Sequence, residues 1–265
     1  MMHSAGTDAW GFHKQLAAAQ EETDKPAIIE LSRRIVEADP QDSTTWETLA
    51  RTQFEVAEYD RCTATLNAWE NAVKPHPAVI NDLRGDVAEA RKDHKAAEQY
   101  WRSYFVARPD AVDGLEKLAD LYASEKRRRN AVEFRTRALA LNETADGCIR
   151  RANLYMELHD WDKALDDSDK ANALDPSDAA VKEWLPKFEL LRKFVRRIKL
   201  LDAQIGKSQG AAVLWLDRAR LLTLANRSDL ALTDCRQAMK LGPGIRPVPI
   251  LRRHTPWTLW VARRK

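Results

Sequence analysis

Small apolar residues recur at fixed intervals along the chain, and the stretch 151–176 shows the pattern clearly. Ala152 lies on a first predicted helix, and Ala164 and Ala171 lie a heptad apart on a second. Small residues suit the places where two helix backbones come closest, because larger side chains then fill the gaps around them. The stretch therefore predicts a helical hairpin with a turn at 159–161 and a proline at its end.

The same spacing recurs with a period of about 34 residues. The other copies are marked by Ala50 with Cys62, Gly85 with Ala97, Ala119 with Ala131 and Ala138, and Ala219 with Ala231 and Ala238, and a weaker copy ends at Pro40. One hairpin is too small to bury its own core. The repetition therefore predicts an array in which neighbouring hairpins cover one another.

This pattern resembles the tetratricopeptide repeat, whose hairpins follow W-x2-L-G-x2-Y, then A-x3-F and a closing P. Each copy matches only part of this pattern. The Trp position is occupied by Trp46 and Trp215, and the Leu position by Leu49 and Leu118. The Gly position is occupied by Gly85, Ala50, Ala119, Ala152 and Ala219, and the Tyr position by Tyr122 and Tyr155. The Leu slot is altered in three copies, where Arg84, Arg151 and Arg218 stand. The resemblance covers roughly residues 9–243.

The resemblance implies an all-α fold, a right-handed superhelical solenoid of antiparallel helix pairs with about six repeats and one degenerate unit. We expect the repeat domain to cover residues 1–243 and a Pro-rich tail with basic and aromatic residues to cover 244–265. Prolines interrupt any helix in the tail, so we expect it either to fold back over the last hairpin as a cap or to be disordered. A linker into a further domain and an anchor for a membrane or nucleic acid are the other possibilities.

The degenerate unit covers residues 178–205, where Pro186 occupies the small-residue slot of a first helix. The apolar residues that follow it keep three- and four-residue spacing: Phe188, Leu191, Val195 and Ile198. We therefore expect one long helix rather than a hairpin. A hinge that bends the array around a partner is the alternative explanation.

Composition is typical of a helical protein without membrane spans: of 265 residues, 44% are hydrophobic, 31% are charged and only 9 are Gly. No apolar run approaches the ~18 residues that cross a bilayer, and the N-terminal sequence lacks the features of a signal peptide. We expect a cytoplasmic protein with Cys62, Cys148 and Cys235 as buried free thiols.

Catalytic and ligand motifs are lacking in the sequence. GKS at 206–208 has no Gly at Leu201, where a phosphate-binding loop needs one, and no pair of the six His has ligand spacing. The acidic run of Asp166, Asp167 and Asp169 is expected to face solvent. We therefore expect no enzyme, no catalytic residues, no cofactor, no metal site and no small-molecule substrate.

Charge is distributed unevenly along the chain. Residues 1–120 contain 14 Lys+Arg and 22 Asp+Glu, whereas the remainder contains 29 and 18. In the tetratricopeptide family the first helices line a concave groove, and the resemblance places these candidate residues there: Glu47, Asp82, Asp86, Asp113, Glu116, Asp120, Asp146 and Asn153. The first two-thirds of the groove is thus predicted to be acidic.

Two like-charge pairs in this set need an explanation. Asp82 with Asp86 and Glu116 with Asp120 are four residues apart, a spacing that lowers helix stability by a few tenths of a kcal/mol. A surface whose charges all have one sign raises the local concentration of oppositely charged ligands and speeds their association. A basic peptide or protein is therefore the expected partner, and an ordinary solvated face is the competing explanation.

The predicted function is a non-catalytic scaffold for protein–protein interaction. Members of the family that bind acidic C-termini carry cations and Asn on the inward slots, which only Asn153 and Arg220 match here. Two alternatives stay open: a regulatory repeat arm of a larger enzyme or kinase, and binding of nucleic acid or another polyanion by the basic C-terminal half. For the segment 187–199, a core helix with cations extending to solvent is preferred over nucleic-acid binding.

Overall fold

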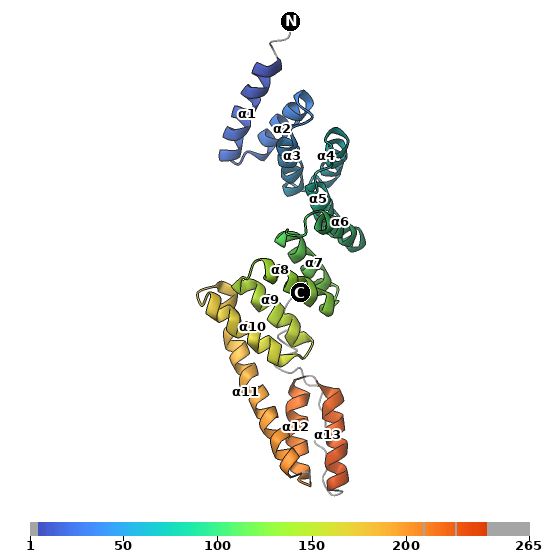
Figure 1. Ribbon diagram of the computed structural model, residues 1–265, viewed down its shortest axis with the longest axis vertical. Coiled ribbons are helices and arrows are strands. Elements are labelled where there is room, and N and C mark those ends of the chain that lie inside the picture. The colour runs from blue at the N-terminus through green and yellow to red at the C-terminus, as the bar shows by residue number, and fades with distance from the viewer. Residues whose placement is uncertain (1–4, 209, 226, 243–265) are drawn as a thin grey trace. The chain divides into compact units, whose positions relative to one another are not determined.

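The computed structural model describes residues 5–208, 210–225 and 227–242, with side chains described from Gly11 onward. Within these ranges every regular element is an α-helix, and successive helices pack as antiparallel hairpins (Figure 1). The all-α prediction is confirmed. The chain divides into two compact units after Gly147, which we call unit 1 and unit 2. The tail at 244–265, for which a cap was one expectation, lies outside the described residues.

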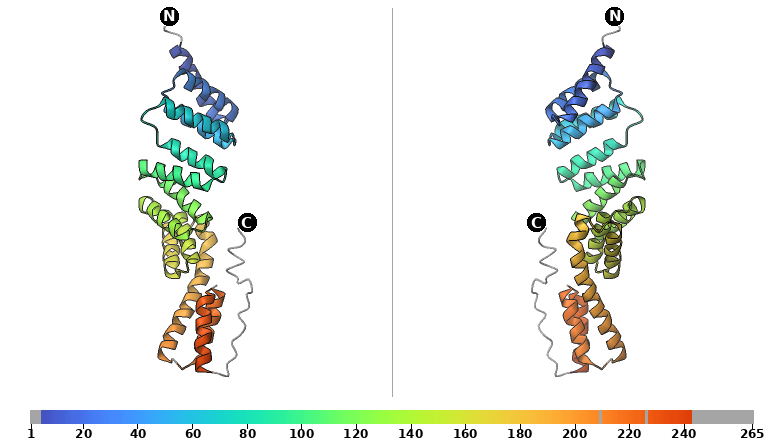
Figure 2. Two further views of the ribbon diagram at one scale, coloured as in Figure 1. Left: turned by 90° about the vertical axis from the view of Figure 1, so that its right-hand side faces the viewer. Right: turned by 90° about the vertical axis from the view of Figure 1, so that its left-hand side faces the viewer.

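Unit 1 consists of four consecutive hairpins and the start of a fifth, and its helices follow one another as stacked pairs in Figure 2. The helices are α1 (Ala5–Glu21), α2 (Lys25–Ala38), α3 (Ser43–Glu55), α4 (Tyr59–Ala72), α5 (Val79–Ala90), α6 (His94–Ala107), α7 (Val112–Ser124) and α8 (Arg128–Leu141). The odd-numbered members are the first helices of their hairpins. Consecutive first helices also meet directly, as α3 and α5 do.

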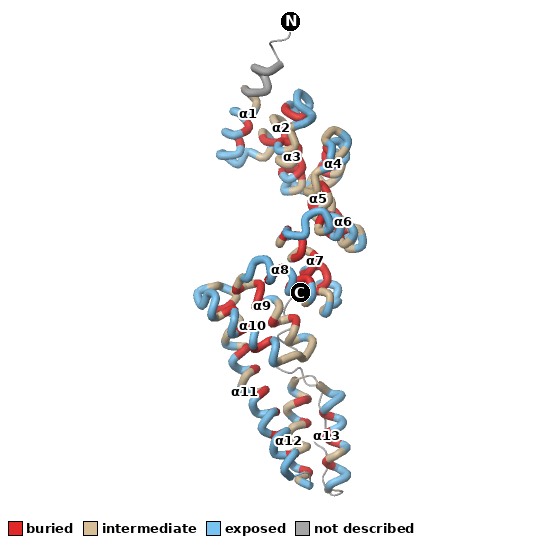
Figure 3. The backbone as a smooth tube through the Cα atoms, in the orientation of Figure 1, coloured by how far each residue is buried: buried red, intermediate tan, exposed pale blue. Residues whose placement is uncertain are grey.

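Unit 2 contains two hairpins separated by one long helix. The helices are α9 (Ala145–Glu157), which begins in unit 1, then α10 (Trp161–Leu174), α11 (Ala179–Lys207), α12 (Ala212–Leu224) and α13 (Ser228–Leu241). The described residues thus form six hairpins and one unpaired long helix, as the spacing predicted. Pro186 lies inside α11, and the predicted apolar residues form its buried face: Phe188, Leu191, Val195 and Ile198 (Figure 3).

The first five hairpins share one type of turn. A non-glycine residue with positive φ follows each first helix, at Thr23, Ala57, Lys92, Lys126 and His159. Left-handed backbone at the end of a helix lets the chain reverse direction while the last carbonyls remain hydrogen-bonded. The turn predicted at 159–161 is therefore observed, with α9 ending at Glu157 and α10 beginning at Trp161.

The small residues lie where neighbouring helices touch. Ala152, Ala164 and Ala171 are completely buried. Gly85 of α5 lies under the indole of Trp101 of α6, so close that an added Cβ would be 2.3 Å from the indole Nε1. The predicted packing slots are therefore confirmed as buried positions in contact with a neighbouring helix at Gly85 and as fully buried positions at the three alanines.

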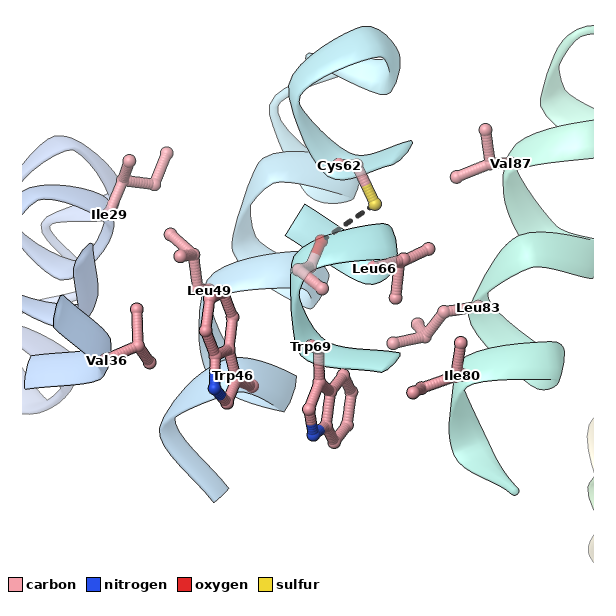
Figure 4. Close-up of a cluster of buried hydrophobic side chains, with 11 residues drawn as sticks. Ile29, Val36, Trp46, Leu49, Cys62, Leu66, Trp69, Ile80, Leu83 and Val87 are labelled. Carbon is pink, nitrogen blue, oxygen red and sulfur yellow. Dashed lines mark hydrogen bonds between the residues drawn. The ribbon is translucent and has the colours of Figure 1, made fainter. Parts of the chain in front are cut away.

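Large side chains fill the spaces between these contacts, as a cluster from α2, α3, α4 and α5 shows (Figure 4). Leu66 and Trp69 of α4 are completely buried at its centre. Burial of one such side chain stabilises a fold by about 1.5–3 kcal/mol. In the same cluster the Sγ of Cys62 donates a hydrogen bond to the Ala50 carbonyl oxygen at 3.3 Å, and burial raises the pKa of the thiol to about 11.

The prediction of buried free thiols is confirmed. Cys62, Cys148 and Cys235 are all buried and form no disulfide. Cys62 and Cys235 belong to hydrophobic clusters on two different hairpins, where they act as small apolar side chains.

Candidate functional site

All eight predicted site residues lie on first helices. Seven are in unit 1 and Asn153 is in unit 2: Glu47 on α3, Asp82 and Asp86 on α5, Asp113, Glu116 and Asp120 on α7, and Asp146 and Asn153 on α9. Asp113 is exposed, and Asp146 is half-buried near the start of α9. Asn153 is also half-buried, and its Oδ1 has no hydrogen-bond partner among the described residues.

The first like-charge pair binds a lysine of the next first helix. Lys117 Nζ lies 2.6 Å from an Asp82 oxygen and 2.8 Å from an Asp86 oxygen. Asp82 is almost completely buried. Burial raises the pKa of Asp86 despite the attraction of Lys117. Burial alone would lower the pKa of Lys117, but the two carboxylates together raise it above its ordinary value. The pair therefore joins α5 to α7.

The second like-charge pair binds an arginine of its own hairpin. Arg135 of α8 donates a hydrogen bond to Asp120, and its Nη1 lies 3.5 Å from a Glu116 oxygen. The Arg135 side chain is only 2% exposed, whereas those of Glu116 and Asp120 are 44% and 52% exposed. The guanidinium is thus held inside the hairpin, and both carboxylates still face solvent.

The predicted carboxylates of unit 1 include residues of three successive first helices, α3, α5 and α7. Glu47 forms an ion pair with Arg51 at 2.8 Å. Burial lowers the pKa of Arg51, but Glu47 and the more distant Asp82 and Asp86 raise it above its ordinary value. We call this surface the first-helix face of unit 1, and define it by these residues: Glu47, Arg51, Asp82, Asp86, Asp113, Glu116, Lys117 and Asp120.

These contacts change the explanation of the like-charge pairs. The sequence suggested that helix stability alone would not select them, but each pair binds one cation of the fold. Sequence reasoning missed Lys117 and Arg135. The available signal was periodicity, because Lys117 lies 35 residues after Asp82, about one repeat further along the chain. Asp82 and Asp86 share one lysine, so this pair retains negative charge after its ion pairs have formed.

The arginines that replace Leu in the repeat pattern all form ion pairs, two of them with a buried aspartate. Arg151 binds Asp167 through two hydrogen bonds of 2.7 Å, and Arg218 binds Asp234 through two of 2.7 and 2.6 Å. In both cases the acid lies 16 residues after the arginine, on the second helix of the same hairpin. The third, Arg84, binds Glu70 of α4 instead, at 2.8 Å.

The outward-facing acidic run predicted on α10 is only partly correct. Asp166 is exposed, but Asp167 is buried because it is the partner of Arg151. Asp169 is exposed and bonds to Arg192 of α11. Asp167 turns inward because Arg151 of the neighbouring helix α9 offers a guanidinium that binds both of its carboxylate oxygens.

A second polar cluster lies on α6, α7 and α8. Glu98 accepts hydrogen bonds from Arg127 at 2.6 Å, from the Tyr122 hydroxyl at 2.7 Å and from Arg102 at 3.0 Å. Chiefly through Arg127, these donors lower the pKa of Glu98 to about 2. The guanidinium of Arg127 also lies 4.3 Å from the centre of the Tyr122 ring. This cluster joins neighbouring hairpins and has no arrangement typical of catalysis.

Neither a candidate metal site nor a candidate membrane span occurs among the described residues. No group of three or more His, Cys, Asp or Glu side chains there is placed to hold a metal ion. None of the described helices is long and apolar enough to cross a membrane.

Comparison with solved structures identifies the fold. A tetratricopeptide-repeat protein of Parabacteroides merdae is 14% identical, with a TM-score of 0.55 over 89% of this chain and 94% of that one. MamA of Desulfovibrio magneticus is 14% identical, with a TM-score of 0.57 over 66% and 99%. A thermophilic tetratricopeptide-repeat protein of Thermus thermophilus is 18% identical, with a TM-score of 0.50 over 69% and 99%.

Sequence comparisons add no relative. No protein-family model matches the chain, and no curated protein matches it. The resemblance to the tetratricopeptide repeat is therefore confirmed by the structure, and the chain has the tetratricopeptide-repeat fold.

Proposed function

We propose that this protein is a non-catalytic scaffold for protein–protein interaction, and that the first-helix face of unit 1 binds a basic segment of its partner. One observation supports this proposal above the others. On α5, Asp82 and Asp86 share Lys117, and on α7 the side chains of Glu116 and Asp120 remain about half exposed, so acidic groups stay available on this face after the internal ion pairs have formed. A surface with residual charge of one sign attracts a ligand of the other sign.

The residues of the face have different roles in this proposal. Asp113, Glu116 and Glu47 are at least partly exposed and would contact the cations of the partner. Asp82 is buried and occupied by Lys117, so its role is to hold α7 against α5. A face fixed by such internal pairs is formed before the partner arrives, which reduces the ordering entropy that binding costs.

The choice of variant follows from the ion pairs. Neutralising Asp82 with Asp86 would leave the half-buried Lys117 without its partners, and neutralising Glu116 with Asp120 would remove these two partners of the buried Arg135, a loss that for a buried pair typically costs about 3–5 kcal/mol. The test variant therefore combines Glu47→Gln, Asp113→Asn and Glu116→Gln. Its matched control combines Glu37→Gln, Asp110→Asn and Glu133→Gln, three exposed acids elsewhere in unit 1.

The probe is a fluorescein-labelled oligolysine peptide, titrated with protein and followed by fluorescence anisotropy. Exposed ion pairs each contribute about 0.2–1 kcal/mol, so we expect the test variant to bind roughly fivefold or more weakly at low salt. The loss should lie mainly in the association rate and shrink at high salt. Equal affinities of the test variant, the control and the wild type would contradict the acidic-face proposal.

The nucleic-acid alternative finds little support on α11. Two aromatic residues of segment 187–199 are packed inside unit 2: Phe188 is completely buried, and Phe194 contacts Trp161 edge-on with ring centres 5.8 Å apart. Single-stranded nucleic acids stack their bases on exposed aromatic rings. We therefore retain protein binding as the proposed function.

A further inference from the structure

The long helix α11 has one buried face and two flanks fixed by ion pairs. Its apolar face packs between α10 and α12. On the α10 side, Lys199 lies 2.6 Å from Asp162, and Arg192 bonds to Asp169. On the α12 side, Asp202 lies 2.7 Å from Arg218. These contacts leave the opposite side of the helix uncovered by described residues.

The uncovered side carries cations between two exposed leucines. We call it the α11 stripe, and it consists of Leu190, Lys193, Arg196, Arg197 and Leu200. The steps of three and four residues from Leu190 through Lys193 and Arg197 to Leu200 place these side chains on one face of an α-helix. Leu190 and Leu200 are 56% and 57% exposed, and ten residues of helix separate them by about 15 Å.

The stripe lies on the part of the fold that departs from the repeat. In a regular hairpin, each helix is covered by its partner helix and by a neighbouring hairpin. In α11 the two helices of a repeat are replaced by one continuous helix of 29 residues, which therefore has no hairpin partner. Figure 1 shows α10 beside its first half and α12 beside its second half. The described part of unit 2 thus leaves one side of this helix uncovered.

The cations of the stripe differ from the other cations of the same helix. Lys187, Arg192 and Lys199 each form an ion pair with a described carboxylate. Lys193, Arg196 and Arg197 form none with a described residue, and all three are exposed. Like charges three or four residues apart destabilise a helix by a few tenths of a kcal/mol each. Glu189, four residues before Lys193, forms its ion pair with Arg192 instead.

We propose that the α11 stripe binds an acidic amphipathic helix of a partner protein, with two apolar side chains of that helix contacting Leu190 and Leu200. The chain itself contains an example of such packing. α10 binds another side of α11 through Asp162 and Asp169, and its Trp161 packs on Phe194. The stripe offers the same combination of cations and apolar side chains to a helix from outside.

This surface is distinct from the one in the proposed function. It lies in unit 2 and is basic, so it selects an acidic partner. The first-helix face is acidic and would select a basic one. The two exposed leucines favour a protein over a nucleic acid, which offers negative charge but no matching apolar side chains. The result of its test is therefore independent of whether the first-helix face binds a basic segment.

The probe is a labelled synthetic helical peptide with two leucines ten residues apart and three glutamates between them at the spacing of the stripe. A scrambled peptide of the same composition, oligouridylate and phosphatidylserine vesicles are tested in parallel. One variant combines Lys193→Gln, Arg196→Gln and Arg197→Gln, and a second combines Leu190→Ser and Leu200→Ser. The matched control neutralises three exposed cations of α10 and α13: Lys163→Gln, Arg236→Gln and Lys240→Gln.

We expect the wild type and the control to bind the designed peptide more tightly than the scrambled one. Both stripe variants should lose roughly tenfold or more in affinity while circular dichroism remains unchanged. The cation variant isolates the charges and the leucine variant the apolar contacts, so poor folding of one leaves the other informative. Binding of both peptides with equal affinity would overturn the proposal. It would also fail if oligouridylate or vesicles bound through the cations regardless of Leu190 and Leu200.

Discussion

Gly85 provides the sharpest test of the packing between first and second helices. In Gly85→Ala, the new Cβ would lie 2.3 Å from Nε1 and 2.4 Å from Cδ1 of the Trp101 indole. Real contacts to Cβ are more than 1 Å longer, so one of the two helices must move. The indole is only 1% exposed and cannot swing into solvent without leaving the core.

Two opposing effects determine how much Gly85→Ala changes the free energy of unfolding. Alanine within a helix is more stable than glycine by about 0.5–1 kcal/mol. Overpacking of a core costs about 1–3 kcal/mol, and a clash this short with a buried ring belongs at the upper end. We therefore expect Gly85→Ala to lower the free energy of unfolding by about 2 kcal/mol. For a protein of this size the melting temperature should fall by roughly 4–8 °C.

The assay is urea and thermal unfolding followed by circular dichroism at 222 nm. Gly206→Ala is the matched control, because Gly206 also lies in a helix and an added Cβ there has nothing within 4 Å. It should leave stability unchanged or raise it by up to about 1 kcal/mol. In a Trp101→Leu background the effect of Gly85→Ala should become smaller. A Gly85→Ala protein as stable as the wild type would refute the close contact.

Two further predictions concern polar contacts. Arg151→Leu should lower the free energy of unfolding by about 3–5 kcal/mol, because it restores the family residue but leaves Asp167 buried without a partner; adding Asp167→Phe should recover most of this loss in urea unfolding. The pKa of Glu98 is lowered from 4.5 to about 2, so its ionised form stabilises the fold above pH 4.5 and this contribution is lost as pH falls toward 2. The difference in melting temperature between wild type and Glu98→Gln should therefore shrink across that range; a constant difference would show that the charge of Glu98 is not responsible.

The fold could be predicted from the sequence because the repeat presents the same packing problem many times. Ala152, Ala164 and Ala171 recur at equivalent positions in other copies, and all three are completely buried. The long helix was predictable for the same reason. Phe188, Leu191 and the apolar residues that follow keep helical spacing through the position where a turn would be needed.

The site was less predictable because the repeat pattern does not specify which cation each carboxylate of the first-helix face binds. The sequence places Asp82 and Asp86 on a first helix, but it does not show that Lys117 lies between them and the solvent. Ion pairs depend on side-chain direction across helices, whereas periodicity reports only which face a residue occupies. The acidic face was therefore predicted with the right helices but without its internal cations.

The positions of Arg151 and Asp167 can be compared with the equivalent positions of another repeat in the same chain. The position of Arg151 on α9 is held by Leu118 on α7, and the position of its partner Asp167 is held by Phe134 on α8. Leu118 and Phe134 are both buried, so the same pair of positions is filled either by two apolar side chains or by an arginine and an aspartate. A buried charge is tolerated only with its partner, which means that the two positions must change together. An arginine in the Leu slot of a further repeat therefore predicts an acid within reach, and Arg218 with Asp234 meets that rule at the same separation.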